Sequence, residues 1–191
     1  MAKDMFRERE RAEEEAYFRR EDAGLIAKLR QHAQLSEIAQ ALAEKLHADQ
    51  PALLERIKKL GVTLDTGAAF ILAPLVEVAW ADGDISHHER DTILHIAKQR
   101  GVVPDSADHQ QLLEWLDHRP SDEMLRTALE AIRIGISVLP KEESEQRVSD
   151  MIKACEEVAK AAGGLSRLLH LEGVSREEST VIAAIRSHLA N

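Results

Sequence analysis

Apolar residues recur at spacings of three and four along most of the chain, and this period is typical of amphipathic helices. The sequence has no alternating β-branched runs bounded by Asn-Gly turns, which would predict strands. Proline, glycine and helix-capping residues divide the pattern into separate segments. We therefore expect an all-α protein with helices over residues 51–60, 67–82, 86–101, 105–118, 121–139 and 141–162 and from about residue 175 onward.

The first part of the chain has a different pattern. Almost every second residue between positions 3 and 30 is charged, and this predicts a solvated helix. An apolar stripe begins at Leu25 and continues through Leu35, Ile38, Leu42 and Leu46, so docking on the body should begin near Leu25. The predicted organisation is a charged N-terminal helix at 1–30, connector helices packed on the body at 31–66, and a helical domain of two degenerate helix-turn-helix halves at 67–191.

Charge and composition narrow the classes of partner and location. The chain carries 25 Lys and Arg against 34 Asp and Glu, a formal net charge of -9, which is the wrong sign for a nucleic-acid partner. A single cysteine, Cys155, and a charged start without an apolar signal segment favour a cytoplasmic location. The longest apolar stretch, residues 68–81, falls short of the roughly 20 residues that a membrane span needs. We expect a buried core helix there.

An acidic turn separates two of the predicted helices. Asp82 and Asp84 flank Gly83, and Glu89 follows one turn into the next helix, so three carboxylates could converge on one hard cation such as calcium or magnesium. The spacing differs from the twelve-residue EF-hand loop. Ser86-x-x-Glu89 also matches a capping box, and spacing alone favours this structural role. The two interpretations are compatible, since a capping glutamate can still expose an oxygen.

A degenerate copy of this segment occurs near the C-terminal end. Val174-Ser175-Arg176-Glu177-Glu178 parallels Ile85-Ser86-His87-His88-Glu89, and each follows an apolar helix that ends in small residues and glycine. The copy keeps a second capping box, Ser175-x-x-Glu178, but lacks the aspartates. Two related halves are therefore expected, with Glu178 as the counterpart of Glu89.

Other candidate chemistry is weaker. His87, Asp91 and His95 recur every four residues, a spacing that suits zinc, but structural zinc normally recruits more ligands and a solvated helix face is favoured. The sequence has no phosphate-binding glycine loop, no His-Glu-x-x-His motif and no nucleophile elbow, so we expect a protein that is not an enzyme. Cys155 lies among apolar residues at helical spacing and is interpreted as a buried hydrophobe.

The acidic turn carries a family resemblance. The stretch Val78-Ala79-Trp80-Ala81-Asp82-Gly83-Asp84-Ile85-Ser86-His87-His88-Glu89 resembles the hallmark of the TerB (tellurite resistance) family, and the likeness extends from about residue 68 to the C-terminus. It implies a TerB-like helical bundle of two halves, a stress-response adaptor working through protein-protein interaction, and a metal site for calcium, magnesium or zinc. Its ligands would be Asp82, Asp84 and Glu89, with Glu178 from the second half. Ala162-Gly163 stands where that family pattern expects Asp-Gly.

The N-terminal segment carries a second resemblance. The inhibitory helix of the mitochondrial ATP synthase inhibitor protein is similar to two stretches here, Phe6-Arg7-Glu8-Arg9-Glu10-Arg11-Ala12-Glu13 and Glu15-Ala16-Tyr17-Phe18-Arg19-Arg20. This resemblance implies an F-type ATPase partner, contacted through Glu13, Tyr17, Phe18 and Arg19. The alternative is a charged solvated helix, which composition favours. A third interpretation is a ligand-free scaffold homodimer that uses the N-terminal helix or Trp80 and Trp115 as contacts.

Overall fold

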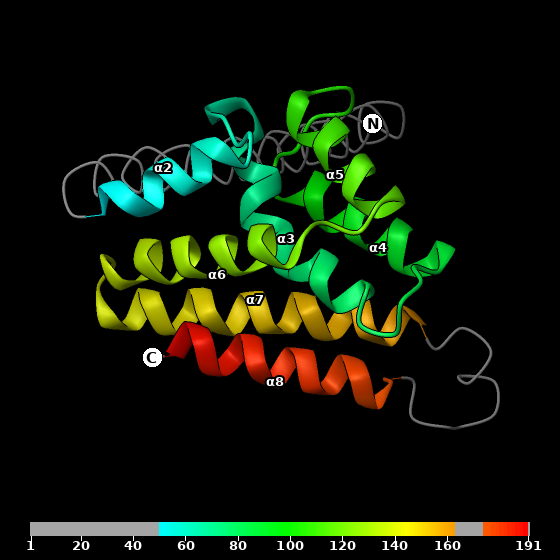
Figure 1. The fold of residues 1–191 in the computed structure, drawn as a ribbon. Coiled ribbons are helices and arrows are strands. Elements are labelled where there is room, and N and C mark those ends of the chain that lie inside the picture. Colours follow the sequence, from blue (N-terminus) through cyan, green and yellow to red (C-terminus); the bar gives the residue numbers. More distant parts are fainter. Residues whose placement is uncertain (1–49, 163–173, 191) are drawn as a thin grey trace, which may run out of the picture.

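The computed structural model describes residues 50–162 and 174–190. All regular secondary structure in these ranges is helical (Figure 1). The all-α prediction is therefore confirmed for this part of the chain. The predicted charged helix at 1–30 and residues 31–49 of the predicted connector lie outside the described residues. The helices are α2 (Pro51–Lys59), α3 (Gly67–Ala79), α4 (His87–Gln99), α5 (Ala107–Asp117), α6 (Asp122–Ser137), α7 (Lys141–Ala162) and α8 (Arg176–Ala190), with a short 3-10 turn at Leu64–Thr66.

Local chemistry explains where these helices begin and end. Pro51 occupies the first turn of α2, where its missing N–H costs nothing. Ser86, Ser106 and Ser121 cap α4, α5 and α6 by accepting a backbone N–H with their hydroxyl groups. Gly101 follows α4 with a φ of 94°, a left-handed conformation that glycine adopts without steric cost. The predicted boundaries therefore agree with the observed ones to within a few residues.

Helix α3 is the centre of the bundle. It packs against α4 and α5 and against the group formed by α6, α7 and α8, which run alongside one another (Figure 1). Its side chains are buried almost all round, and the fully buried ones include Leu72, Leu75, Val76 and Val78. Residues 68–81 thus contain the buried core helix that the sequence predicts. Among the described residues, no helix is long and apolar enough to cross a membrane.

The connector segment reaches the body through α2. Leu53 and Ile57 of α2 are buried in the common core, and α2 packs on α6. An ion pair between Arg56 and Glu130 joins the two helices at the surface. The connector thus contacts the bundle through α2 in the part of it that the structure describes, residues 50–66.

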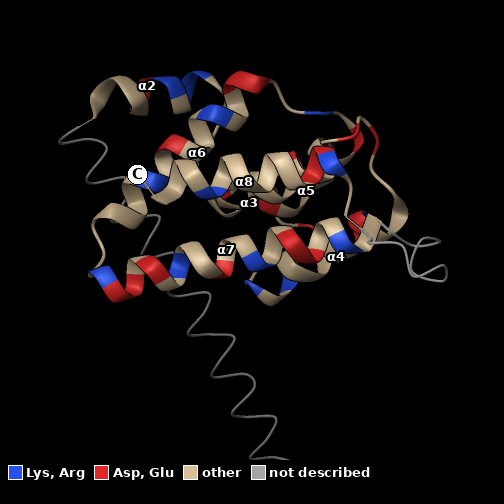
Figure 2. Ribbon diagram, turned by 90° about the horizontal axis from the view of Figure 1, so that it is seen from below, with Lys and Arg blue, Asp and Glu red and all other residues tan. Residues whose placement is uncertain are grey.

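Basic and acidic residues are interspersed along α7 (Figure 2). Arg147 pairs with Glu143 at 3.3 Å and Lys153 with Asp150 at 3.5 Å, each within one helical turn. Pairs of this kind stabilise a helix by only about 0.2–0.5 kcal/mol each. The apolar core, rather than surface charge, therefore holds α7 in place.

Two helix starts meet at one end of α7. Helix α7 packs against both α4 and α8, and Figure 1 shows the N-terminal ends of α4 and α8 beside the C-terminal end of α7. The turn that contains Asp82 and Asp84 leads into α4 at this end. The fold therefore brings the two parts that the degenerate repeat relates to the same end of the bundle.

Candidate functional site at the starts of two helices

Glu89 forms a complete capping box at the start of α4. The Glu89 N–H donates to Ser86 Oγ at 3.3 Å, and the Ser86 N–H donates to Glu89 Oε2 at 2.8 Å. The predicted cap is therefore confirmed. The side chain is nevertheless only 3% exposed, which is unusual for a capping glutamate on a helix surface, because carboxylates are rarely buried without a compensating partner.

Glu178 repeats this arrangement at the start of α8. The Ser175 N–H donates to Glu178 Oε2 at 2.6 Å, and the Glu178 N–H donates to Ser175 Oγ at 3.0 Å. Its side chain is 1% exposed, and Oε1 is buried without a hydrogen-bond partner among the described residues. A buried polar atom without a partner costs roughly 1–3 kcal/mol and calls for a physical explanation.

Burial and nearby negative charges both act on the carboxyl group of Glu89. Burial raises the pKa of Glu89 above its ordinary value, and the hydrogen bonds with Ser86 only partly oppose this rise. The negative charges of Glu178 and Asp82 raise the pKa further. The carboxyl group of Glu89 is therefore buried near two further negative charges, and a cation there would relieve both the burial cost and the repulsion.

The two aspartates of the acidic turn have a different environment. Asp82 and Asp84 are exposed. Asp82 Oδ1 accepts the N–H of Asp84 at 3.3 Å, and Asp84 Oδ1 accepts the N–H of Ile85 at 3.0 Å. Gly83 between them has a φ of 99°. The aspartates therefore shape the turn, in keeping with the preference of Asp for local hydrogen bonds to the backbone.

The predicted ligand set is thus divided. The structure buries Glu89 and Glu178 and leaves Asp82 and Asp84 on an exposed turn. Within residues 50–162 and 174–190, no three His, Cys, Asp or Glu side chains are gathered closely enough to hold a metal ion by themselves. A cation at this place would have two buried carboxylates and would complete its coordination with water, as magnesium and calcium do.

The histidine row on α4 lies on the surface. His87, Asp91 and His95 are all exposed, and Nε2 of His95 lies 2.8 Å from Nε2 of Gln99. These positions fit the solvated helix face that the sequence favours.

Cys155 and the tryptophans have structural roles. Cys155 is fully buried, and burial raises the pKa of its thiol to about 12, so the reactive thiolate is scarce at neutral pH. The indole N–H of Trp80 donates to the carbonyl of Trp115 at 2.8 Å and so ties the end of α3 to α5. Trp115 is only 6% exposed, which makes it unsuitable as the dimer contact that the scaffold interpretation proposes.

The structure reveals the environment of two charged residues that the sequence pattern does not indicate. Asp108 of α5 accepts the N–H of Ala69 at 2.8 Å and so caps the start of α3 from 39 positions away in the chain. Glu77 of α3 has a buried Oε2 without a hydrogen-bond partner among the described residues, and burial raises its pKa despite the nearby charge of Arg119. Glu77 appears in the sequence only as an acid within an apolar run.

The four predicted partner-binding residues, Glu13, Tyr17, Phe18 and Arg19, lie outside the described part of the chain. Comparison with known protein families, with curated proteins and with solved structures finds no match. The TerB resemblance therefore depends on the sequence motif alone, and the arguments about function depend on the residues themselves.

Proposed function

We propose that the chain is a non-enzymatic, TerB-like stress-response adaptor that holds a divalent cation between the starts of α4 and α8. The observation that supports this function most is the buried pair Glu89 and Glu178, with Oε1 of Glu178 left without a partner among the described residues. A buried anion needs a compensating charge or a proton, and a hard divalent cation is the natural ligand for carboxylate oxygens.

The capping geometry leaves oxygens available for a ligand. Each capping box uses Oε2 of its glutamate to accept a serine N–H. Oε1 of Glu178 has no partner among the described residues, and in Glu89 the capping bond from Ser86 goes to Oε2 and not to Oε1. The capping bonds fix both carboxylates while these second oxygens can bind a cation. Oxygen ligands suit calcium and magnesium better than zinc, which favours nitrogen and sulfur.

Such a cation would link two parts of the bundle that are far apart in the sequence. Glu89 begins α4 and Glu178 begins α8, and both helices pack on α7. Cation binding would therefore hold the two helix starts together and stabilise one arrangement of this end of the bundle. An adaptor could present that arrangement to a protein partner, so that cation binding and association are coupled.

Thermal unfolding of the metal-stripped full chain tests this function. A cation that binds only the folded state stabilises it, by about 2.7 kcal/mol at a concentration one hundred times its Kd. We expect calcium or magnesium to raise the Tm of the wild-type protein and of Glu177→Gln, an exposed neighbour with the same change in charge. Glu178→Gln, which keeps the shape of the side chain, should lose the response. An equal response in Glu178→Gln and wild type would refute the site.

The N-terminal motif supports a second candidate function, regulation of an F-type ATPase. The feature that favours this function is the Tyr17-Phe18 pair in an otherwise charged segment, because aromatic side chains are effective interface anchors. The full chain should slow ATP hydrolysis by purified F-type ATPase, and Tyr17→Ala/Phe18→Ala should relieve the effect. Hydrolysis at an unchanged rate in the presence of excess wild-type chain would exclude this candidate.

A further inference from the structure

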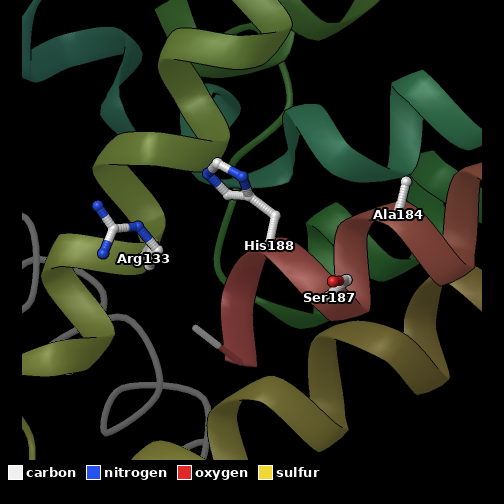
Figure 3. Close-up of a pocket in the computed structure, with 4 residues that line it drawn as sticks. All are labelled: Arg133, Ala184, Ser187 and His188. Atoms are coloured by element: carbon white, nitrogen blue, oxygen red, sulfur yellow. The ribbon is translucent and has the colours of Figure 1, made fainter.

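A hollow of about 600 Å³ lies between α6 and α8, away from the two capping glutamates. Arg133 of α6 and Ala184, Ser187 and His188 of α8 line it (Figure 3). In Figure 3 the imidazole of His188 extends from α8 toward α6, and the guanidinium group of Arg133 is directed away from that imidazole. Its volume is within the range of about 300–1,000 Å³ that is usual for ligand sites.

Arg133 differs from most other arginines of the described chain. Arg56, Arg90, Arg119, Arg147 and Arg186 each pair with a carboxylate. Arg133 is half-buried and has no ion pair or hydrogen bond among the described residues. The nearest acid along its helix, Glu130, is already paired with Arg56 of α2. The hollow therefore contains a partly desolvated guanidinium group whose donors are unused within residues 50–162 and 174–190.

We propose that this hollow binds an oxyanion group, a carboxylate or a phosphate. The guanidinium group of Arg133 presents a planar fork of N–H donors that matches two oxygens of such a group. His188 also lines the hollow, and a ring N–H of its imidazole is a further donor there. A chain with a net charge of -9 repels anions at long range, so a local cationic site must select its ligand by short, directional hydrogen bonds.

The hollow at Arg133 is separate from the proposed cation site, and it attracts ligands of the opposite charge. Glu178 stands in the first turn of α8, whereas Ser187 and His188 stand in its last turn. Binding of an anion at Arg133 therefore neither requires nor supplies a metal ion. A bound acidic ligand would bridge α6 and α8, which already pack on each other.

The test is a titration of the ¹⁵N-labelled full chain with sodium phosphate and, separately, with sodium succinate, followed by amide chemical shifts at constant ionic strength. We expect saturable shifts at residues of α6 and α8 around the hollow. Arg133→Gln should weaken binding about tenfold, the loss of one charge-assisted contact. Arg186→Gln is the matched control, because it removes one positive charge from α8 at a side chain that contacts Glu156 of α7 instead.

The outcomes separate the sources of the anionic group. Tighter binding of phosphate assigns a phosphate ligand, and tighter binding of succinate assigns a carboxylate ligand. Sodium chloride shifts of the same size at the same amides would overturn the site. So would equal weakening in Arg133→Gln and Arg186→Gln, which would reduce the effect to overall charge. Equal Tm values for the two variants would confirm that a loss of binding is not a loss of folding.

Discussion

Two replacements of Glu89 separate its role as a helix cap from its role as a negative charge. Glu89→Ala removes both the cap and the charge, whereas Glu89→Gln removes only the charge. Glu89→Ala removes the acceptor of the Ser86 N–H, a bond of 2.8 Å to a charged group that is worth about 1.5–3 kcal/mol. It also removes the buried stem of the side chain, worth about 0.8 kcal/mol per CH₂. Relief of the buried charge offsets part of this cost. We expect a net loss of about 3 kcal/mol in the free energy of unfolding without metal.

Glu89→Gln keeps the shape of the side chain and an oxygen acceptor for the Ser86 N–H. It loses the stronger hydrogen bond of a charged acceptor, but it also removes the repulsion from Glu178 and Asp82 and the cost of burial. These effects oppose each other, so the expected change is within about 1 kcal/mol. We therefore expect the charge of Glu89 to be dispensable for folding of the metal-free protein and available to bind a cation.

Urea unfolding of the metal-stripped chain at neutral pH measures both effects. For 191 residues, about 3 kcal/mol corresponds to a fall in Tm of roughly 6–12 °C, so calorimetry gives an independent check. Asp91→Asn, an exposed change on the same helix, is the control and should stay within about 0.5 kcal/mol of wild type. If Glu89→Gln lost as much stability as Glu89→Ala, the negative charge would already be compensated within the protein, and the case for a cation would fail.

Three further predictions concern other buried groups. Burial raises the pKa of Glu77 in the folded state above its ordinary value of 4.5, so between the unfolded-state pKa and the folded-state pKa the folded protein binds more protons. The free energy of unfolding should therefore fall as pH rises through this window. Glu77→Gln should flatten this part of the curve of unfolding free energy against pH, and an unchanged slope would contradict the burial of its charge. Asp108→Ala should cost about 1 kcal/mol through loss of the α3 cap, measured by urea unfolding. The comparison is Asp91→Ala at an exposed position of α4, and equal losses in the two variants would refute the cap. Cys155 should react with a thiol reagent only after unfolding, and rapid labelling of the native chain would disprove its burial.

The sequence predicts the helices well because the signals that bound them are local. Ser86 and Glu89 form a cap from residues three positions apart, and Pro51 and Gly101 act through their own backbone conformations. Ranges and types of the elements over the described residues could therefore be read from spacing and capping chemistry. The 3-10 turn at Leu64–Thr66 was not predicted, since three residues carry too little periodicity to recognise.

The candidate site could be predicted only in part. Spacing identifies Glu89 and Glu178 as helix caps, and the repeat suggests that they are equivalent. Their burial depends on how α4 and α8 pack on α7, which no local signal specifies. The exposed position of Asp82 and Asp84 has the same origin. Tertiary packing likewise determines the Asp108 cap, because its acceptor and donor are 39 positions apart.

Calorimetric titration of the metal-stripped full chain with calcium, magnesium and zinc tests the cation site most directly. We expect saturable binding of a divalent cation to the wild-type protein, and loss of that binding in the double variant Glu89→Gln/Glu178→Gln. The double variant keeps both capping acceptors, so loss of binding can be assigned to the two charges once its native fold is verified. Absence of binding to the wild type, or equal binding to the double variant, would contradict the account and leave Glu89 and Glu178 as helix caps alone.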